Sequence, residues 1–80
     1  MKKMENIEKP KHKIGDLVYL ATEDNPKIGY IFRIQTDLDW GYCYSVQWSE
    51  DDVFTYPGIS IDIMKRNLQK LRDSMEQENE

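Results

Sequence analysis

Few residues of this 80-residue chain have the types and spacing that catalysis requires. The carboxylates of Glu50, Asp51 and Asp52 are adjacent, but such a run between two strands is typical of a solvated turn rather than of a general acid and base. His12, the single histidine, lies among lysines and is expected to be solvated. Cys43, the single cysteine, is expected to be a small packed residue rather than a nucleophile. We therefore expect no enzyme activity, no cofactor and no metal site.

Aromatic side chains are the chemical feature left over. Two Trp, five Tyr and two Phe are more than a small domain can enclose, so several should lie at its margins. Aromatic faces with carboxylates nearby attract cations, and this chain places Asp37 and Asp39 beside Trp40 and Tyr42. A large exposed ring also suggests a surface that a partner covers. The candidate partner-binding residues are Asp37, Asp39, Trp40, Tyr42, Phe32 and Phe54. The alternative, that these rings only cover the ends of the domain, stays open.

The element expected to organise the chain is a β-hairpin. Large side chains from Tyr42 to Trp48 alternate with small or polar ones, the period of two that indicates a half-buried strand. Residues 49–52 suit a tight turn, and Val53–Tyr56 follow as a β-branched and aromatic strand. Trp48, on the same face as the core residues of its strand, is expected to be buried.

Two further strands are expected before this hairpin. Residues 17–21 form the first, and residues 28–35 form the second, in which Gly29 suggests a bend or a bulge. Residues 36–41 are expected to be a loop with Trp40 at its tip. The predicted core contains Val18, Leu20, Ile31, Ile34, Tyr44, Val46, Trp48, Tyr56, Leu68 and Leu71.

Residues 61–76 allow two interpretations. Apolar residues at steps of three and four indicate one face of an amphipathic helix. In the other interpretation, a single helical turn over 61–66 precedes a closing strand over 67–71. An isolated helix of this length is marginal in water, and four strands alone would leave unpaired edges. We therefore favour the closing strand.

Charge and composition narrow the choice of partner. Residues 1–13 carry five lysines and two glutamates, yet the net charge of the chain is −4, and residues 34–64 contain no Lys or Arg. Nucleic-acid binding needs a positive stripe, so the body of the domain argues against it. The alternative function is nucleic-acid binding by Lys9, Lys11 and Lys13, with exposed rings stacking on bases.

No apolar run approaches the ~18 residues that suggest a membrane span. The N-terminus also lacks the apolar region of a signal peptide. We therefore expect a cytoplasmic protein with no membrane partner.

With five short strands in this order, the chain resembles an SH3-like barrel of the Tudor/KOW type. The resemblance is carried by Gly15-Asp16-Leu17-Val18, Gly29-Tyr30-Ile31, Tyr44-Ser45-Val46-Gln47-Trp48 and Leu68-Gln69-Lys70-Leu71. This spacing is similar to that of short SH3-like proteins found in tailed-phage genomes. It implies an all-β, five-stranded SH3-like barrel over 14–71 with a short helical turn before the last strand. A flexible basic N-terminal arm over 1–13 and an acidic C-terminal tail over 72–80 would flank the barrel.

One barrel hosts many unrelated roles, so the resemblance constrains function little. The leading expectation is a non-enzymatic protein–protein interaction module that binds a basic patch on another protein. It would act as a phage accessory factor on a host protein, in the host cytoplasm, or as a small virion component.

Overall fold

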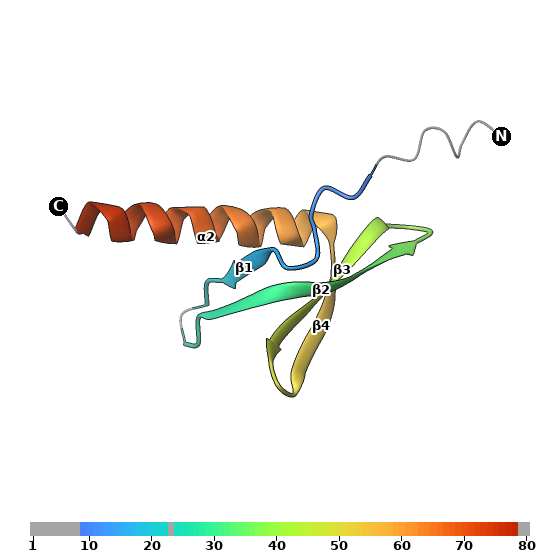
Figure 1. The fold of residues 1–80 in the computed structure, drawn as a ribbon, viewed down its shortest axis with the longest axis horizontal. Coiled ribbons are helices and arrows are strands. Elements are labelled where there is room, and N and C mark those ends of the chain that lie inside the picture. Colours follow the sequence, from blue (N-terminus) through green and yellow to red (C-terminus); the bar gives the residue numbers. More distant parts are fainter. Residues whose placement is uncertain (1–8, 23, 79–80) are drawn as a thin grey trace.

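Four antiparallel strands and one long C-terminal helix make up the fold (Figure 1). The structure is a computed structural model, and it describes residues 9–22 and 24–78. The strands are β1 (Leu17–Leu20), β2 (Lys27–Asp37), β3 (Gly41–Ser49) and β4 (Asp52–Pro57), and the helix is α2 (Gly58–Glu78). Their order across the sheet is β1-β2-β3-β4, so each strand pairs with its neighbour in sequence.

The expected five-stranded SH3-like barrel over residues 14–71 is wrong. The segment predicted to be a helical turn and a closing strand is one continuous helix of 21 residues. Its buried residues Ile61, Met64 and Leu68 follow the spacing of three and four that places side chains on one face of a helix. Packing against the sheet removes the objection that an isolated helix is marginal, because tertiary contacts supply most helical stability.

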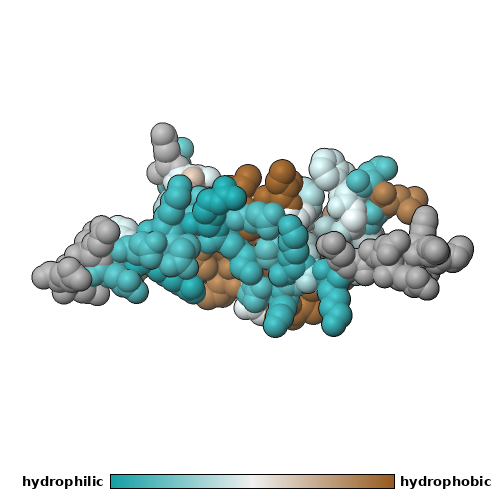
Figure 2. Space-filling view, turned by 90° about the horizontal axis from the view of Figure 1, so that it is seen from above, coloured by the Kyte–Doolittle hydropathy of each residue, from teal (hydrophilic) through white to brown (hydrophobic). Residues whose placement is uncertain are grey.

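Helix α2 also covers one of the two edges that a sheet of four strands leaves unpaired. It packs mainly along β1, the strand at one edge of the sheet, while β4 forms the other edge. Seen from the helix side, the outer surface of α2 is hydrophilic and apolar side chains show on both of its flanks (Figure 2). The C-terminal end of α2 extends beyond the sheet (Figure 1), and residues 72–78 of the expected acidic tail belong to it. Residues 1–8 of the expected arm lie outside the described residues.

The core lies between α2 and one face of the sheet. Its fully buried members from the strands are Val18, Ile31, Tyr44 and Val46, all of which belong to the predicted core. Ile61 and Met64 from α2 complete it, and these two were missing from the predicted core because that segment was assigned a short turn. Leu20, Ile34, Tyr42, Trp48 and Tyr56 pack around the cluster as partly buried residues.

The organising hairpin is confirmed, with two differences in detail. Trp48 is half-buried rather than buried, and its indole Nε1 donates a hydrogen bond of 2.9 Å to the Tyr56 hydroxyl. The bulge of β2 lies at Phe32, between Ile31 and Arg33, rather than at Gly29. Gly29 serves close packing instead, because a Cβ there would lie 2.7 Å from Cε3 of Trp48.

Candidate functional site: an apolar groove beside a buried polar clasp

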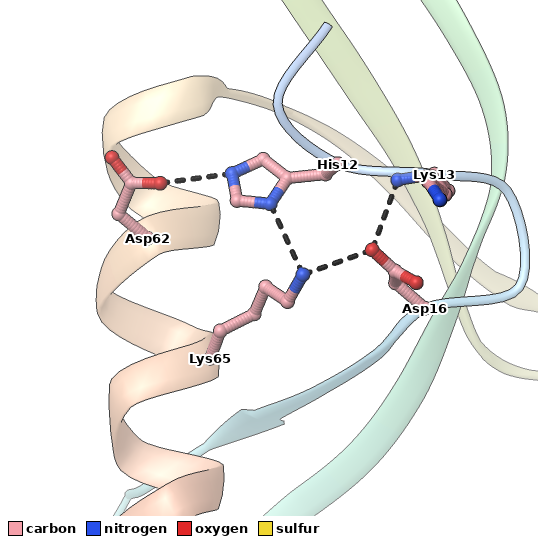
Figure 3. Close-up of polar contacts among 5 residues, drawn as sticks. All are labelled: His12, Lys13, Asp16, Asp62 and Lys65. Carbon is pink, nitrogen blue, oxygen red and sulfur yellow. Dashed lines mark hydrogen bonds and ion pairs between the residues drawn. The ribbon is translucent and has the colours of Figure 1, made fainter.

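A polar network joins the segment before β1 to the first turns of α2 (Figure 3). His12 is 6% exposed, and its Nε2 lies 2.8 Å from Oδ1 of Asp62. Nζ of Lys65 lies 3.3 Å from Nδ1 of His12 and donates to Oδ2 of Asp16 at 2.9 Å. The same Asp16 oxygen accepts the backbone N–H of Lys13 at 2.9 Å. We call His12, Asp16, Asp62 and Lys65 the clasp.

The clasp holds chain segments together and leaves His12 no nitrogen for catalysis. An ammonium group donates only, so the Lys65 contact makes Nδ1 the acceptor and leaves the Nε2–H to donate to Asp62. Both ring nitrogens are therefore occupied, and a general base needs a free one. The ring edge also contacts Tyr44, with centroids 5.0 Å apart. The expectation that His12 is solvated is wrong, because partners distant in sequence cover it.

Electrostatics at Asp16 are consistent with this structural role. The backbone hydrogen bond from Lys13 and the ammonium group of Lys65 lower the pKa of the Asp16 carboxyl below its ordinary value of 3.8. Both contacts favour the charged carboxylate over the protonated form, as expected for a group that holds two donors in place.

An apolar groove of about 630 Å³ borders the clasp. The chain before β1, the β2–β3 turn and the start of α2 meet at this end of the molecule (Figure 1). Trp40, Tyr42, Pro57 and Ile59 form its apolar walls, and His12, Tyr44, Gly58 and Asp62 also line it. Trp40 and Ile59 are each 64% exposed. The groove therefore presents apolar surface that no described part of the chain covers.

The β2–β3 turn fixes Trp40 at the groove wall. Oδ1 of Asp37 accepts the backbone N–H groups of Asp39 at 2.8 Å and Trp40 at 3.2 Å, a side-chain pattern that stabilises tight turns. Asp37 pairs with Gly41, whose φ of +76° closes the turn in the left-handed region that favours glycine. The sequence Asp37-Leu38-Asp39-Trp40-Gly41 thus dictates a defined turn rather than a loose loop.

The structure brings together some of the predicted partner-binding residues and separates others. Trp40 and Tyr42 line the groove, and Asp37 and Asp39 lie on the turn that carries Trp40. Phe32 and Phe54 are not among the residues that line the groove. Phe32 sits at the β2 bulge, where the guanidinium carbon of Arg33 lies 5.8 Å from its ring centroid. Phe54 is opposite Val46 and packs on Tyr56, with ring centroids 4.9 Å apart.

Two of the three lysines of the alternative hypothesis share this groove. Lys9 and Lys11 line it together with Trp40 and Tyr42, whereas Lys13 does not. Sequence reasoning missed Pro57 and Ile59. Pro57 follows directly after the predicted strand Val53–Tyr56, and Ile59 takes its place at the groove from the long helix, which the sequence analysis did not favour.

The other candidate groups show no reactive arrangement among the described residues. Asp52 forms an ion pair of 2.9 Å with Lys27, and no cluster of three potential metal ligands occurs within 9–22 and 24–78. Burial, together with the negative charge of Asp37, raises the pKa of the Cys43 thiol, and a protonated thiol is a poor nucleophile. Within the part of the chain that the structure describes, no helix has the length and apolar character needed to cross a membrane.

Comparison of this chain with protein-family models, with curated proteins and with solved structures finds no match. The function must therefore be argued from the groove, the clasp and the charges around them.

Proposed function

We propose that the protein is a non-enzymatic protein–protein interaction module whose groove holds an apolar side chain of another protein. The observation that carries the proposal is the pair of exposed walls: Trp40 on the β2–β3 turn and Ile59 on α2 both face one groove. Contiguous exposed apolar surface marks interaction sites, and Trp is enriched among residues that dominate binding energy. The turn is held by its own hydrogen bonds, so little ordering is needed when a partner binds.

Charges around the groove define the chemistry of the partner. Asp37 and Asp39 favour a basic patch on one side, while Lys9 and Lys11 favour acidic groups on the other. A matching partner presents an apolar side chain between groups of opposite charge. We also propose a cytoplasmic location and a role as a phage accessory factor or virion component. These two points rest on the single cysteine and on the sequence motifs alone, because the barrel fold that the motifs implied is wrong.

Selection from a displayed random-peptide library tests the proposal without a known partner. We expect the wild-type protein to enrich peptides with an apolar anchor, and Trp40→Ala to bind the same peptides at least ~30-fold more weakly, which corresponds to ~2 kcal/mol. Phe54→Ala is the matched control, because this ring is 60% exposed but lies outside the groove. Equal binding by wild type and Trp40→Ala would refute the proposed site.

A second candidate, nucleic-acid binding, is favoured by one observation. Lys9 and Lys11 line the same groove as Trp40 and Tyr42, and proteins combine basic groups with aromatic rings to hold single strands. The net charge of −4 and the carboxylates of Asp37 and Asp39 oppose it. Titration of a labelled single-stranded oligonucleotide at two salt concentrations separates the two functions. Salt-dependent binding that Lys9→Ala weakens would favour the second candidate.

A further inference from the structure

The tip of the β2–β3 turn has the chemistry that complements the groove. Leu38 is fully exposed, with a relative accessibility of 104%, and it lies between the exposed carboxylates of Asp37 and Asp39. This acidic tip therefore combines an apolar side chain with negative charge. The adjacent groove combines apolar walls with two basic residues, Lys9 and Lys11.

Tip and groove are neighbours in every copy of the chain. Trp40 follows the tip directly in the β2–β3 turn and forms a wall of the groove. The tip cannot fill the groove of its own chain, because the hydrogen bonds of Asp37 and the pairing of Asp37 with Gly41 hold it in the turn. A second copy has no such restriction.

We propose that two copies of this chain form a reciprocal twofold dimer, in which Leu38 of each copy enters the groove of the other. A twofold dimer requires one self-complementary patch, and a projecting tip beside a groove satisfies this condition. In that arrangement Asp39 of one copy approaches Lys11 of the other, and the same contact repeats across the axis. Two such charge contacts offset the repulsion between chains that each carry −4.

The dimer adds regulation to the proposed function. Each groove is filled by the partner copy, so a target protein must compete with dimerisation for the same apolar walls. This consequence rests on the proposed function, whereas the dimer itself does not.

Sedimentation velocity over a range of protein concentrations tests the dimer. We expect the wild type to dimerise and Leu38→Ser to weaken dimerisation at least ~tenfold, the loss expected for an apolar anchor in a pocket. Phe54→Ser is the matched control, since it removes an exposed apolar side chain at the free edge of the sheet. A wild type that stays monomeric, or a dimer that Phe54→Ser disrupts and Leu38→Ser does not, would overturn the proposal.

A charge exchange tests the geometry more sharply. Asp39→Lys and Lys11→Glu should each abolish self-association, because like charges then face each other across the axis. Mixing the two variants restores both opposite-charge contacts, so an equimolar mixture should form a heterodimer. Asp51→Lys makes the same charge change at the exposed β3–β4 turn and should dimerise like the wild type. A mixture that remains monomeric would contradict the reciprocal arrangement.

The Leu38→Ser variant separates the dimer from the binding of another protein, because it removes the tip side chain but leaves the groove walls intact. If the wild type is monomeric but Leu38→Ser still selects Trp40-dependent peptides, the dimer is refuted and the interaction module stands. If the dimer forms through Leu38 but monomeric Leu38→Ser selects no peptide, the interaction with other proteins is refuted and the dimer stands.

Discussion

The clasp and the groove are adjacent, but the clasp buries polar side chains and the groove exposes apolar ones. In the clasp, polar side chains are withdrawn from water and each finds partners: His12 contacts both Asp62 and Lys65, and no unpaired buried side-chain nitrogen or oxygen occurs among the described residues. In the groove, apolar side chains are left in water, with Trp40 and Ile59 each 64% exposed. Satisfied polar groups indicate a structural role, whereas uncovered apolar groups indicate a surface that binds.

The difference identifies which residues maintain the fold and which remain available for recognition. The chain before β1 is short of apolar anchors, so buried His12 and its contacts to α2 fix it against the core. That attachment also places Lys9 and Lys11 at the groove. The clasp is therefore a precondition of the groove, and substitutions in the two regions should separate stability from binding.

The largest effect on stability is expected from a comparison of two isoleucines of α2, one buried and one exposed. Ile61 is fully buried in the core, and Ile59 is 64% exposed at the groove. Ile61→Ala should lower the free energy of unfolding by about 2–5 kcal/mol through lost burial and a cavity. Ile59→Ala should change it by less than about 0.5 kcal/mol. Urea unfolding followed by circular dichroism measures both, and equal losses would show that the groove wall is part of the core.

The clasp should give the next largest effect. His12→Ala removes the shared partner of Asp62 and Lys65, and we expect a loss of about 1–3 kcal/mol in the free energy of unfolding. Lys13→Ala, one residue away, exposed and outside the groove, is the matched control and should be nearly neutral. If the two variants unfold at the same urea concentration, the contacts of His12 do not stabilise the fold.

The titration of Asp16 should have a smaller effect on the free energy of unfolding, seen as a dependence on pH. Its pKa is lowered in the folded protein by hydrogen bonds from Lys13 and Lys65, so near pH 4 the unfolded chain binds more protons than the folded one. The clasp carboxylate therefore contributes stability above about pH 4, and this contribution is lost as the pH falls through the folded pKa. Unfolding measured from pH 7 to pH 2 should show a steeper acid decline in wild type than in Asp16→Asn. Parallel curves for the two proteins would argue against the ion pair.

Sequence reasoning located the hairpin and the strand part of the core because their information is local. The alternation from Tyr42 to Trp48 indicates a strand, and the structure buries Tyr44 and Val46 as expected. It also buries Cys43 and Ser45, which lie on the other face of that strand. Trp40 was singled out because it lies in a predicted loop beside Asp37 and Asp39, and the structure exposes it. These inferences need no knowledge of what lies opposite each strand.

The remaining features depend on contacts between distant parts of the chain. The apolar spacing over 61–76 fits a helix, but only the sheet face it covers decides against a closing strand. His12 meets Asp62 and Lys65 across separations of 50 and 53 residues, while its neighbours in sequence are lysines. The signal available was the pair Asp62 and Lys65, which a helix places on one face. Asp62 and Lys65 share a face only if residues 61–66 belong to a helix, so the pair indicates a partner for His12 only when that helix is assumed.

The smallest effect on stability, and the sharpest contrast with the clasp, is expected for Trp40→Ala. The ring is largely in water, and the turn that carries it is held by the side chain of Asp37 and by Gly41 rather than by the indole. We expect the free energy of unfolding to change by less than about 0.5 kcal/mol. His12→Ala in the same urea experiment provides the comparison, because its side chain borders the same groove but is buried. A loss for Trp40→Ala as large as that for His12→Ala would mean that the indole serves the fold. A stable Trp40→Ala protein is what allows its binding defect to be assigned to the groove, since a surface that contributes nothing to folding keeps its apolar area for recognition.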